Sequence, residues 1–130
     1  MALLDISSQV TFLYFDDFPA AKVFFSEVLE LKVVHDPGWA IVYQAAGRSF
    51  LGAVDAREGS IPVDTKGGVL ISLTVSNIQE AHQRLLAKNL PVTPIKGIKG
   101  IAMRSFLFKG PEGYDFEIQQ FDSDELKAIY

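Results

Sequence analysis

The spacing of apolar residues changes along the chain, and its first part predicts a strand followed by a helix. Residues 10–15 (VTFLYF) are β-branched and aromatic, which is typical of a strand. Asp17 and Pro19 then match an N-cap acid and a first-turn proline. The apolar residues that follow recur at helical spacing and predict a helix from about 18 to 29. This apolar face consists of Ala21, Phe24, Phe25, Val28 and Leu29.

Three short apolar runs follow and predict strands at 31–34, 39–44 and 49–54. The breaks between them, 36–38 (DPG) and 45–47 (AAG), have the composition of turns. The first half therefore has the order strand, helix, strand, strand, strand.

The same order begins again after a polar stretch from 55 to 68. Residues 69–75 (VLISLTV) predict a strand, and Asn77 with Glu80 forms a capping box that starts a helix ending near 88. Further strands are expected near 92–95, 101–108 and 114–120, and a short helix is expected over 123–130.

The two halves match each other in order and in position. A shift of 60 residues places Asp17 on Asn77, and a shift of 66 places the turn at 44–47 on 110–113. A βαβββ unit exposes one sheet face that it cannot bury alone, and pairing two units solves that problem. We therefore expect an α+β fold in one domain over 1–130, with repeat 1 at about 8–55 and repeat 2 at about 68–121.

The composition indicates the cellular compartment and excludes some classes of binding partner. The chain has 130 residues, 48% of them hydrophobic, which is enough for a buried core. It has no cysteine, a net charge of −4, and scattered rather than clustered Lys and Arg. The N-terminal segment lacks a basic region, and no apolar run approaches the ~18 residues that span a bilayer. We expect a cytoplasmic protein that binds neither nucleic acid nor membrane.

Two segments resemble a known family. Residues 16–34 (DDFPAAKVFFSEVLELKVV) resemble the first helix of the vicinal oxygen chelate superfamily, the group of glyoxalases, bleomycin resistance proteins and extradiol dioxygenases. Residues 106–121 (FLFKGPEGYDFEIQQF) resemble its C-terminal signature, although Gly110 stands where the family turn usually has Asp. The resemblance implies two tandem βαβββ modules with a curved mixed sheet that encloses a cavity, and it implies a homodimer.

The resemblance also identifies four positions that carry His, Gln or Glu in metal-dependent members. Matching the halves places them on Val10, Leu51, Leu70 and Glu117. A shift of one residue would bring Gln9 to the first position, but Leu51 and Leu70 would still supply no donor. Divalent cations require several nitrogen or oxygen ligands. We therefore expect no metal and no other cofactor.

Glu117 is the candidate for chemistry, since it lies between Phe116 and Ile118 and should face the cavity rather than the helix layer. It would act as a general base or as an acceptor for a ligand amine or hydroxyl. The alternative is a carboxylate that is solvated or paired with a cation. His35 precedes a turn and His82 is expected to face solvent, so neither is expected to take part in chemistry.

Aromatic strand residues suggest the walls of the pocket, because flat ligands stack on such side chains. Arg104 lies on the same side of its strand as Phe106 and Phe108. If that side is the inner one, Arg104 would anchor an anion or pair with Glu117. The predicted pocket residues are Val10, Phe12, Tyr14, Trp39, Ile41, Leu51, Leu70, Ser72, Arg104, Leu107 and Glu117.

These features favour metal-independent binding, by sequestration, of an aromatic or amphipathic small molecule. The alternative is a lyase, isomerase or dioxygenase of the same superfamily that uses Glu117 as a base or a metal ligand. A third possibility is an interaction module without a ligand.

Overall fold

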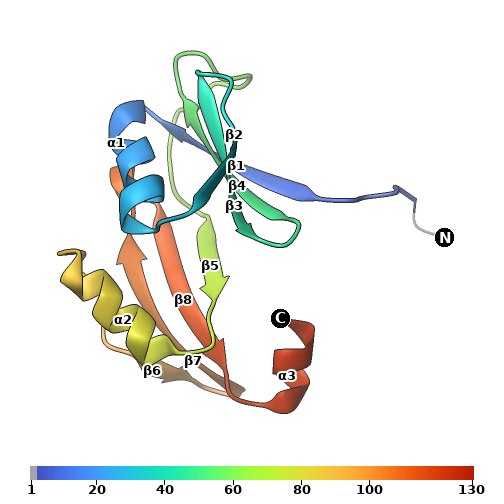
Figure 1. Ribbon diagram of the computed structural model, residues 1–130, viewed down its shortest axis with the longest axis vertical. Helices are drawn as coiled ribbons and strands as arrows, with labels where there is room; N and C mark the ends of the chain where they lie inside the picture. The colour runs from blue at the N-terminus through green and yellow to red at the C-terminus, as the bar shows by residue number, and fades with distance from the viewer. Residues whose placement is uncertain (1–2) are drawn as a thin grey trace. The chain divides into compact units, whose positions relative to one another are not determined.

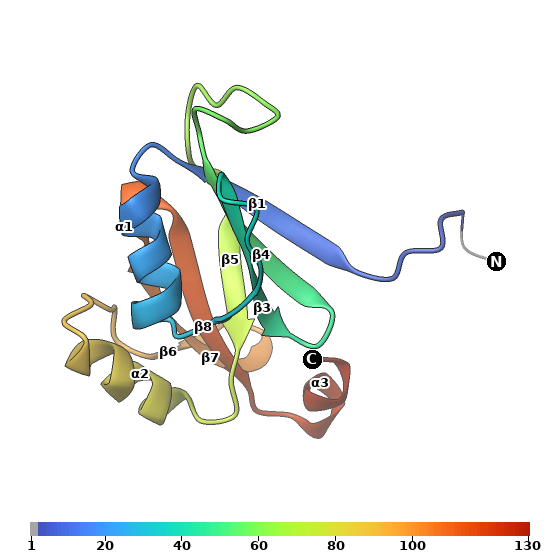
Figure 2. The ribbon, with the colours of Figure 1, turned by 45° about the horizontal axis from the view of Figure 1, so that its top comes forward.

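The computed structural model describes residues 3–130. The chain divides into two compact units, with the boundary between Thr65 and Lys66. Each unit has the order strand, helix, strand, strand, strand, and can be followed by colour in Figures 1 and 2. Each unit is described by itself below.

The first unit contains one four-stranded sheet in the order β1-β4-β3-β2. Strands β1 and β4 are parallel, and the other neighbouring pairs are antiparallel. Its elements are β1 (Gln9–Phe15), α1 (Phe18–Val23), the π-helical turn η1 (Phe24–Val28), β2 (Lys32–His35), β3 (Ala40–Ala46) and β4 (Ser49–Asp55).

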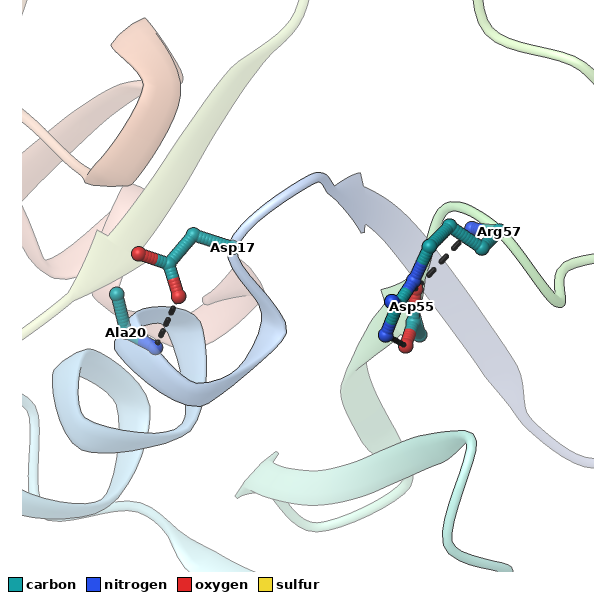
Figure 3. A network of polar contacts seen from close by, with 4 residues as sticks. All are labelled: Asp17, Ala20, Asp55 and Arg57. Carbon is teal, nitrogen blue, oxygen red and sulfur yellow. Dashed lines mark hydrogen bonds and ion pairs between the residues drawn. The ribbon is translucent and has the colours of Figure 1, made fainter.

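Helix α1 begins where the sequence predicts it, because Asp17 satisfies an unpaired backbone donor of the first turn. The amide of Ala20 donates to Asp17 Oδ1 at 3.1 Å (Figure 3). The helix continues into η1 and ends at Glu30, whose φ of 55° is left-handed. The amide of Leu31 then donates to the carbonyl of Phe25 at 3.0 Å, which closes the helix end.

Aromatic side chains fill the space between this helical segment and the sheet. Phe25 packs edge-on against Phe15, with ring centroids 5.9 Å apart, and stacks on Tyr43 at 5.2 Å. All three side chains are fully buried. The apolar helical face read from the sequence is therefore the core of this unit.

A buried carboxylate lies at the end of β4. Asp55 is 4% exposed and accepts two hydrogen bonds from the guanidinium of Arg57, at 3.0 and 2.7 Å (Figure 3). It also accepts from the Arg57 backbone amide at 3.1 Å. The side-chain hydrogen bonds from Arg57, followed by the backbone bond, hold the pKa of Asp55 below its ordinary value of 3.8.

This lowered pKa predicts a pH dependence of stability. A carboxyl with a lower pKa in the folded state contributes stability above its unfolded pKa, and this contribution is lost as pH falls through the folded pKa. We expect the difference in urea midpoint between the wild type and Asp55→Asn to be full at pH 6 and to shrink below about pH 4. A difference that stays constant from pH 6 to pH 2 would contradict the role given to the charge of Asp55.

The second unit repeats the topology, in the order β5-β8-β7-β6 with β5 and β8 parallel. Its elements are β5 (Leu70–Thr74), α2 (Ile78–Ala87), β6 (Lys96–Ile98), β7 (Ile101–Lys109), the turn η2 (Pro111–Gly113), β8 (Asp115–Phe121) and α3 (Asp124–Ile129). Figure 1 shows α2 and α3 on opposite sides of this sheet.

One predicted strand is wrong in position. Residues 92–95 do not form a strand, and Val92 makes an isolated bridge to Phe108 before β6 begins at Lys96. Pro91 and Pro94 flank this bridge. Proline has no backbone donor for a strand ladder, which accounts for the displacement.

Helix α2 is capped as predicted, since the amide of Glu80 donates to Asn77 Oδ1 at 3.1 Å. The carboxylate of Glu80 pairs with Arg84 one turn later. His82, which was expected to face solvent, packs edge-on against Phe106 at 4.8 Å, and its Nε2 lies 2.9 Å from the carbonyl oxygen of Thr93. His82 is therefore part of the packing between α2 and the sheet.

The α+β class and the two βαβββ modules are confirmed. Each module has its own four-stranded sheet, and neither sheet closes on itself. Within residues 3–130, no helix has the length and apolar character needed to cross a membrane.

Candidate functional site

The second unit presents polar and apolar side chains together on the sheet face that α2 does not cover. Residues directly opposite each other on paired strands share a face. Glu117 of β8 lies opposite Ser72 of β5 and Leu107 of β7. Its neighbours Phe116 and Ile118 are buried on the other face, as the alternation predicts. We call the open side the Glu117 face, which includes Leu70, Ser72, Thr74, Leu107, Glu117 and Gln119.

Two hydrogen-bonded pairs follow one another along this face. Ser72 Oγ donates to Glu117 Oε1 at 2.7 Å, and Gln119 Nε2 donates to Thr74 Oγ1 at 2.9 Å. The Ser72 bond orients the carboxylate of Glu117, which is half-buried. No described residue donates to its other oxygen, Oε2. Oε2 is therefore available as an acceptor for a ligand amine or hydroxyl.

Apolar side chains flank the carboxylate. Leu70 is 51% exposed and Leu107 is 44% exposed. At the far end of β8, Phe121 stacks on Tyr130 beyond α3, so α3 lies at one end of this face (Figure 1). An apolar surface with a few polar groups that fix orientation is typical of a small-molecule site.

Arg104 does not join this face. It shares the α2 side of the sheet with Phe106, which packs against His82 of α2. Its guanidinium makes two hydrogen bonds to the carboxylate of Asp122, at 2.9 and 2.8 Å. These bonds hold the pKa of Asp122 below its ordinary value. Arg104 is therefore paired with Asp122 rather than with Glu117.

In the first unit, Val10, Phe12 and Tyr14 share the face of β1 that α1 does not cover, since Phe15 on the other face packs against Phe25. Phe12 is 47% exposed, and its ring lies over the backbone of Gly52 on β4. A Cβ at Gly52 would lie 2.3 Å from Cδ1 of that ring. The aromatic position of Phe12 therefore requires glycine on the neighbouring strand.

Tyr14 lies on the same face but is covered. The amide of Ser60 donates to its hydroxyl at 3.1 Å, and Ala56 and Val63 pack against the cluster around it. A Cβ at Gly59 would lie 2.2 Å from Cε2 of Tyr14. The loop after β4 therefore closes over Tyr14 and leaves Phe12 as the exposed ring.

Two predicted pocket residues lie on the opposite face. Leu51 pairs with Thr11 and Tyr43, and Ile41 shares that side; both are buried on the α1 side of the sheet. The structure does not bring them together with Val10, which lies opposite Phe50. Trp39, 42% exposed, precedes β3, and its carbonyl accepts from the amide of Asp55 at 2.9 Å.

Neither unit assembles the donors that a divalent cation requires. Around Glu117 the side chains opposite it are a hydroxyl and a leucine, and the residue opposite Val10 is Phe50. Within residues 3–130, no group of three or more His, Cys, Asp or Glu is arranged so that it could hold a metal ion. The side chains of each unit therefore do not fit a metal ion.

Some residues that shape these faces were not predicted from the sequence. Gly52 and Gly59 permit the positions of Phe12 and Tyr14, and Thr74 with Gln119 extends the polar row beyond Glu117. Gly52 carried a signal, because a glycine inside a strand pattern often marks a close approach. Thr74 and Gln119 carried none, since their pairing depends on the register of two strands far apart in sequence.

Comparison with known proteins places this geometry in a family. Residues 7–118 match the family described as the Glyoxalase/Bleomycin resistance protein/Dioxygenase superfamily. A comparison with curated proteins finds no match.

Solved structures share the fold at low identity. A lactoylglutathione lyase from Agrobacterium tumefaciens is 23% identical with a TM-score of 0.70, covering 92% of this chain and 96% of that one. The antibiotic-binding protein TnmS3 from Streptomyces sp. CB03234 is 21% identical with a TM-score of 0.76, covering 92% and 99%. A glyoxalase/bleomycin resistance protein/dioxygenase from Nocardioides is 18% identical with a TM-score of 0.75, covering 95% and 88%.

Proposed function

This chain belongs to the Glyoxalase/Bleomycin resistance protein/Dioxygenase superfamily, and from that premise we propose that it binds an aromatic or amphipathic small molecule without a metal. The observation that carries the proposal is the Glu117 face. It holds one oriented carboxylate between two leucine side chains that are about half exposed. Sequestration requires a preformed surface of this kind and no turnover.

The hydrogen bonding of Glu117 supports a role in ligand recognition. Ser72 occupies Oε1 and leaves Oε2 available, so the carboxylate can accept one bond from a ligand in a defined direction. For the Glu117 face of the second unit, we propose Leu70, Ser72 and Leu107 as the further contacts. In the first unit, taken by itself, Phe12 is exposed on the open face and is a candidate contact for a flat ligand there. In the first unit, Val10 and Trp39 remain candidate contacts.

A relative of similar fold supports binding as the leading function. TnmS3 is described as antibiotic-binding, and the lactoylglutathione lyase shows that the same fold also serves an enzyme. Fold alone does not separate the two, because one fold hosts many functions. The missing metal ligands in each unit favour binding.

The assembly that we propose is a cytoplasmic homodimer of one-domain chains. The absence of cysteine from the sequence suits a reducing compartment. The dimer is proposed from the family to which the chain belongs. Sedimentation of the purified protein would measure its mass directly.

The second candidate function is a lyase or isomerase in which Glu117 acts as the base. A catalytic base must reach the proton that it abstracts, and the available Oε2 meets this first requirement. The methylglyoxal–glutathione hemithioacetal separates the two functions, because a protein that only binds does not convert it. Turnover that disappears in Glu117→Gln would support the enzyme.

Replacing Glu117 by glutamine tests the binding site. Loss of a hydrogen bond to a charged group typically costs about 1.5–3 kcal/mol. We therefore expect metal-free bleomycin, used as an amphipathic probe, to bind Glu117→Gln at least about ten-fold more weakly. The free energy of unfolding should change by less than about 0.5 kcal/mol, because the side chain is half exposed. Calorimetric titration and urea unfolding give the two quantities.

The control is Glu125→Gln, which removes an exposed acid of α3 in the same unit. It should leave both quantities unchanged. Equal losses of affinity and stability in Glu117→Gln would leave Glu117 with a structural role. Retention of full affinity in that variant would remove it from the binding site.

A further inference from the structure

A pocket of about 380 Å³ lies in the second unit, between the ends of β5 and β8 and helix α3. Its lining includes Thr74, Ser76, Gln120, Phe121, Lys127 and Tyr130, and we call it the α3 pocket. Along β8, Phe121 lies four residues beyond Glu117, which corresponds to about 13 Å. The α3 pocket therefore lies at one end of the Glu117 face: Thr74 belongs to both, and the Phe121 wall lies away from the carboxylate of Glu117. Its volume lies within the usual range for small-molecule sites.

An aromatic pair forms one wall of this pocket. Phe121 is 6% exposed and stacks on Tyr130 with ring centroids 4.4 Å apart and an angle of 10° between the planes. Tyr130 is 66% exposed, so the face of its ring that points away from Phe121 is open to a ligand. A planar aromatic molecule stacks favourably on such a face.

Hydroxyl groups also line the pocket. Thr74 Oγ1 accepts from Gln119 Nε2, which leaves its own O–H proton to donate. Ser76 contributes a second hydroxyl, and within residues 3–130 its side chain has no hydrogen-bond partner. Both hydroxyls can therefore donate to an acceptor group of a ligand.

Lys127 supplies positive charge at the same place. Lys127 interacts electrostatically with Asp122, but both carboxylate oxygens of Asp122 are already bonded to Arg104. Asp124 and Glu125 lie in the first turn of α3, and no ion pair joins either of them to Lys127 in the described chain. The ammonium of Lys127 is therefore available to an anion.

We propose that the α3 pocket binds a small planar aromatic carboxylate. The ring lies against Tyr130, and the carboxylate accepts from Lys127 and from the hydroxyls of Thr74 and Ser76. This site does not depend on the ligand proposed for the Glu117 face. An uncharged aromatic ligand could stack on Tyr130 but would lack the ionic interaction with Lys127.

The test uses naphthoate and its uncharged counterpart naphthalenemethanol, titrated into the full chain and followed by amide NMR shifts. We expect naphthoate to bind with a dissociation constant on the order of 1 mM or below. Shifts should gather at residues 74–76, 120–121 and 127–130. Naphthoate should bind more tightly than the alcohol.

Lys127→Gln should weaken naphthoate by about three- to five-fold, as expected for an exposed ion pair, and leave the alcohol unchanged. Tyr130→Ala should weaken both probes, roughly five-fold, because the stacking wall is lost. Both side chains are exposed, so the fold should persist. Lys99→Gln, a matched change in the turn between β6 and β7, should alter neither affinity.

Other outcomes overturn the proposal. It fails if neither probe binds at millimolar concentration, if both bind equally, or if Lys127→Gln has no effect on naphthoate. It also fails if the shifts gather at Glu117 and Leu107. Glu117→Gln should leave naphthoate affinity unchanged, so failure at the Glu117 face and failure at the α3 pocket are told apart.

Discussion

Replacing Phe25 by alanine is expected to lower the free energy of unfolding by about 3–5 kcal/mol. Phe25 is fully buried, and its ring contacts Phe15, Phe24 and Tyr43. Removing it leaves a cavity between three rings that cannot all move inward, because each is fixed by its own helix or strand. The loss should appear as a lower urea midpoint with little change in slope.

Phe12→Ala is the matched control in the same unit. Phe12 is a ring of the same size, but it is 47% exposed and lies over Gly52 on the open face. We expect it to cost about 1 kcal/mol or less. Similar losses in the two variants would contradict the assignment of one face to the core and the other to solvent.

Replacing Phe116 by alanine should cost a similar amount, about 3–5 kcal/mol, in the second unit. Phe116 is fully buried on the α2 side of the sheet and stacks on Phe108 with ring centroids 5.3 Å apart. It also precedes Glu117 on the same strand, so alternation places the two side chains on opposite faces. Urea unfolding measures the loss.

The control for Phe116 is Leu107→Ala, on the Glu117 face. Leu107 is 44% exposed, so the expected cost is under about 1.5 kcal/mol. If the Glu117 face binds a ligand, this variant should weaken metal-free bleomycin more than it destabilises the chain. A large loss of stability with unchanged affinity would instead assign Leu107 to the core.

Together these variants distinguish the residues that stabilise each unit from the residues proposed to bind a ligand. The helix-covered faces hold the rings that stabilise each unit, and the open faces carry Phe12, Leu107 and Glu117, which are available to a ligand. The stability loss of a substitution on the open face can therefore be compared with that of a substitution on the covered face of the same unit.

Local patterns predicted most elements. Asp17 and Asn77 marked helix starts because an N-cap satisfies backbone donors only a few residues away. The alternation Phe116-Glu117-Ile118 placed Glu117 opposite the core because strand geometry has a period of two. The strand predicted at 92–95 failed since Pro91 and Pro94 remove backbone donors there.

The positions that depend on register were harder to predict. Val10 and Leu51 were both predicted to line the pocket, but β1 pairs with β4 so that Val10 lies opposite Phe50 and Leu51 lies opposite Thr11. A shift of one residue moves a side chain to the other face. The side chains on both faces of β1 are mostly apolar, so the polarity of the residues could not show which face is buried.

The sequence by itself therefore determined the α+β class, the repeated βαβββ order and the placement of Glu117 on the strand face opposite Phe116 and Ile118, because these follow from local spacing and residue type. The tertiary structure decided that Arg104 pairs with Asp122, that Leu51 and Ile41 belong to the core, and that α3 brings Lys127 and Tyr130 beside Thr74. Each of these depends on which face and which distant strand a residue meets, and strand pairing is settled by packing across the whole unit rather than by neighbours in sequence.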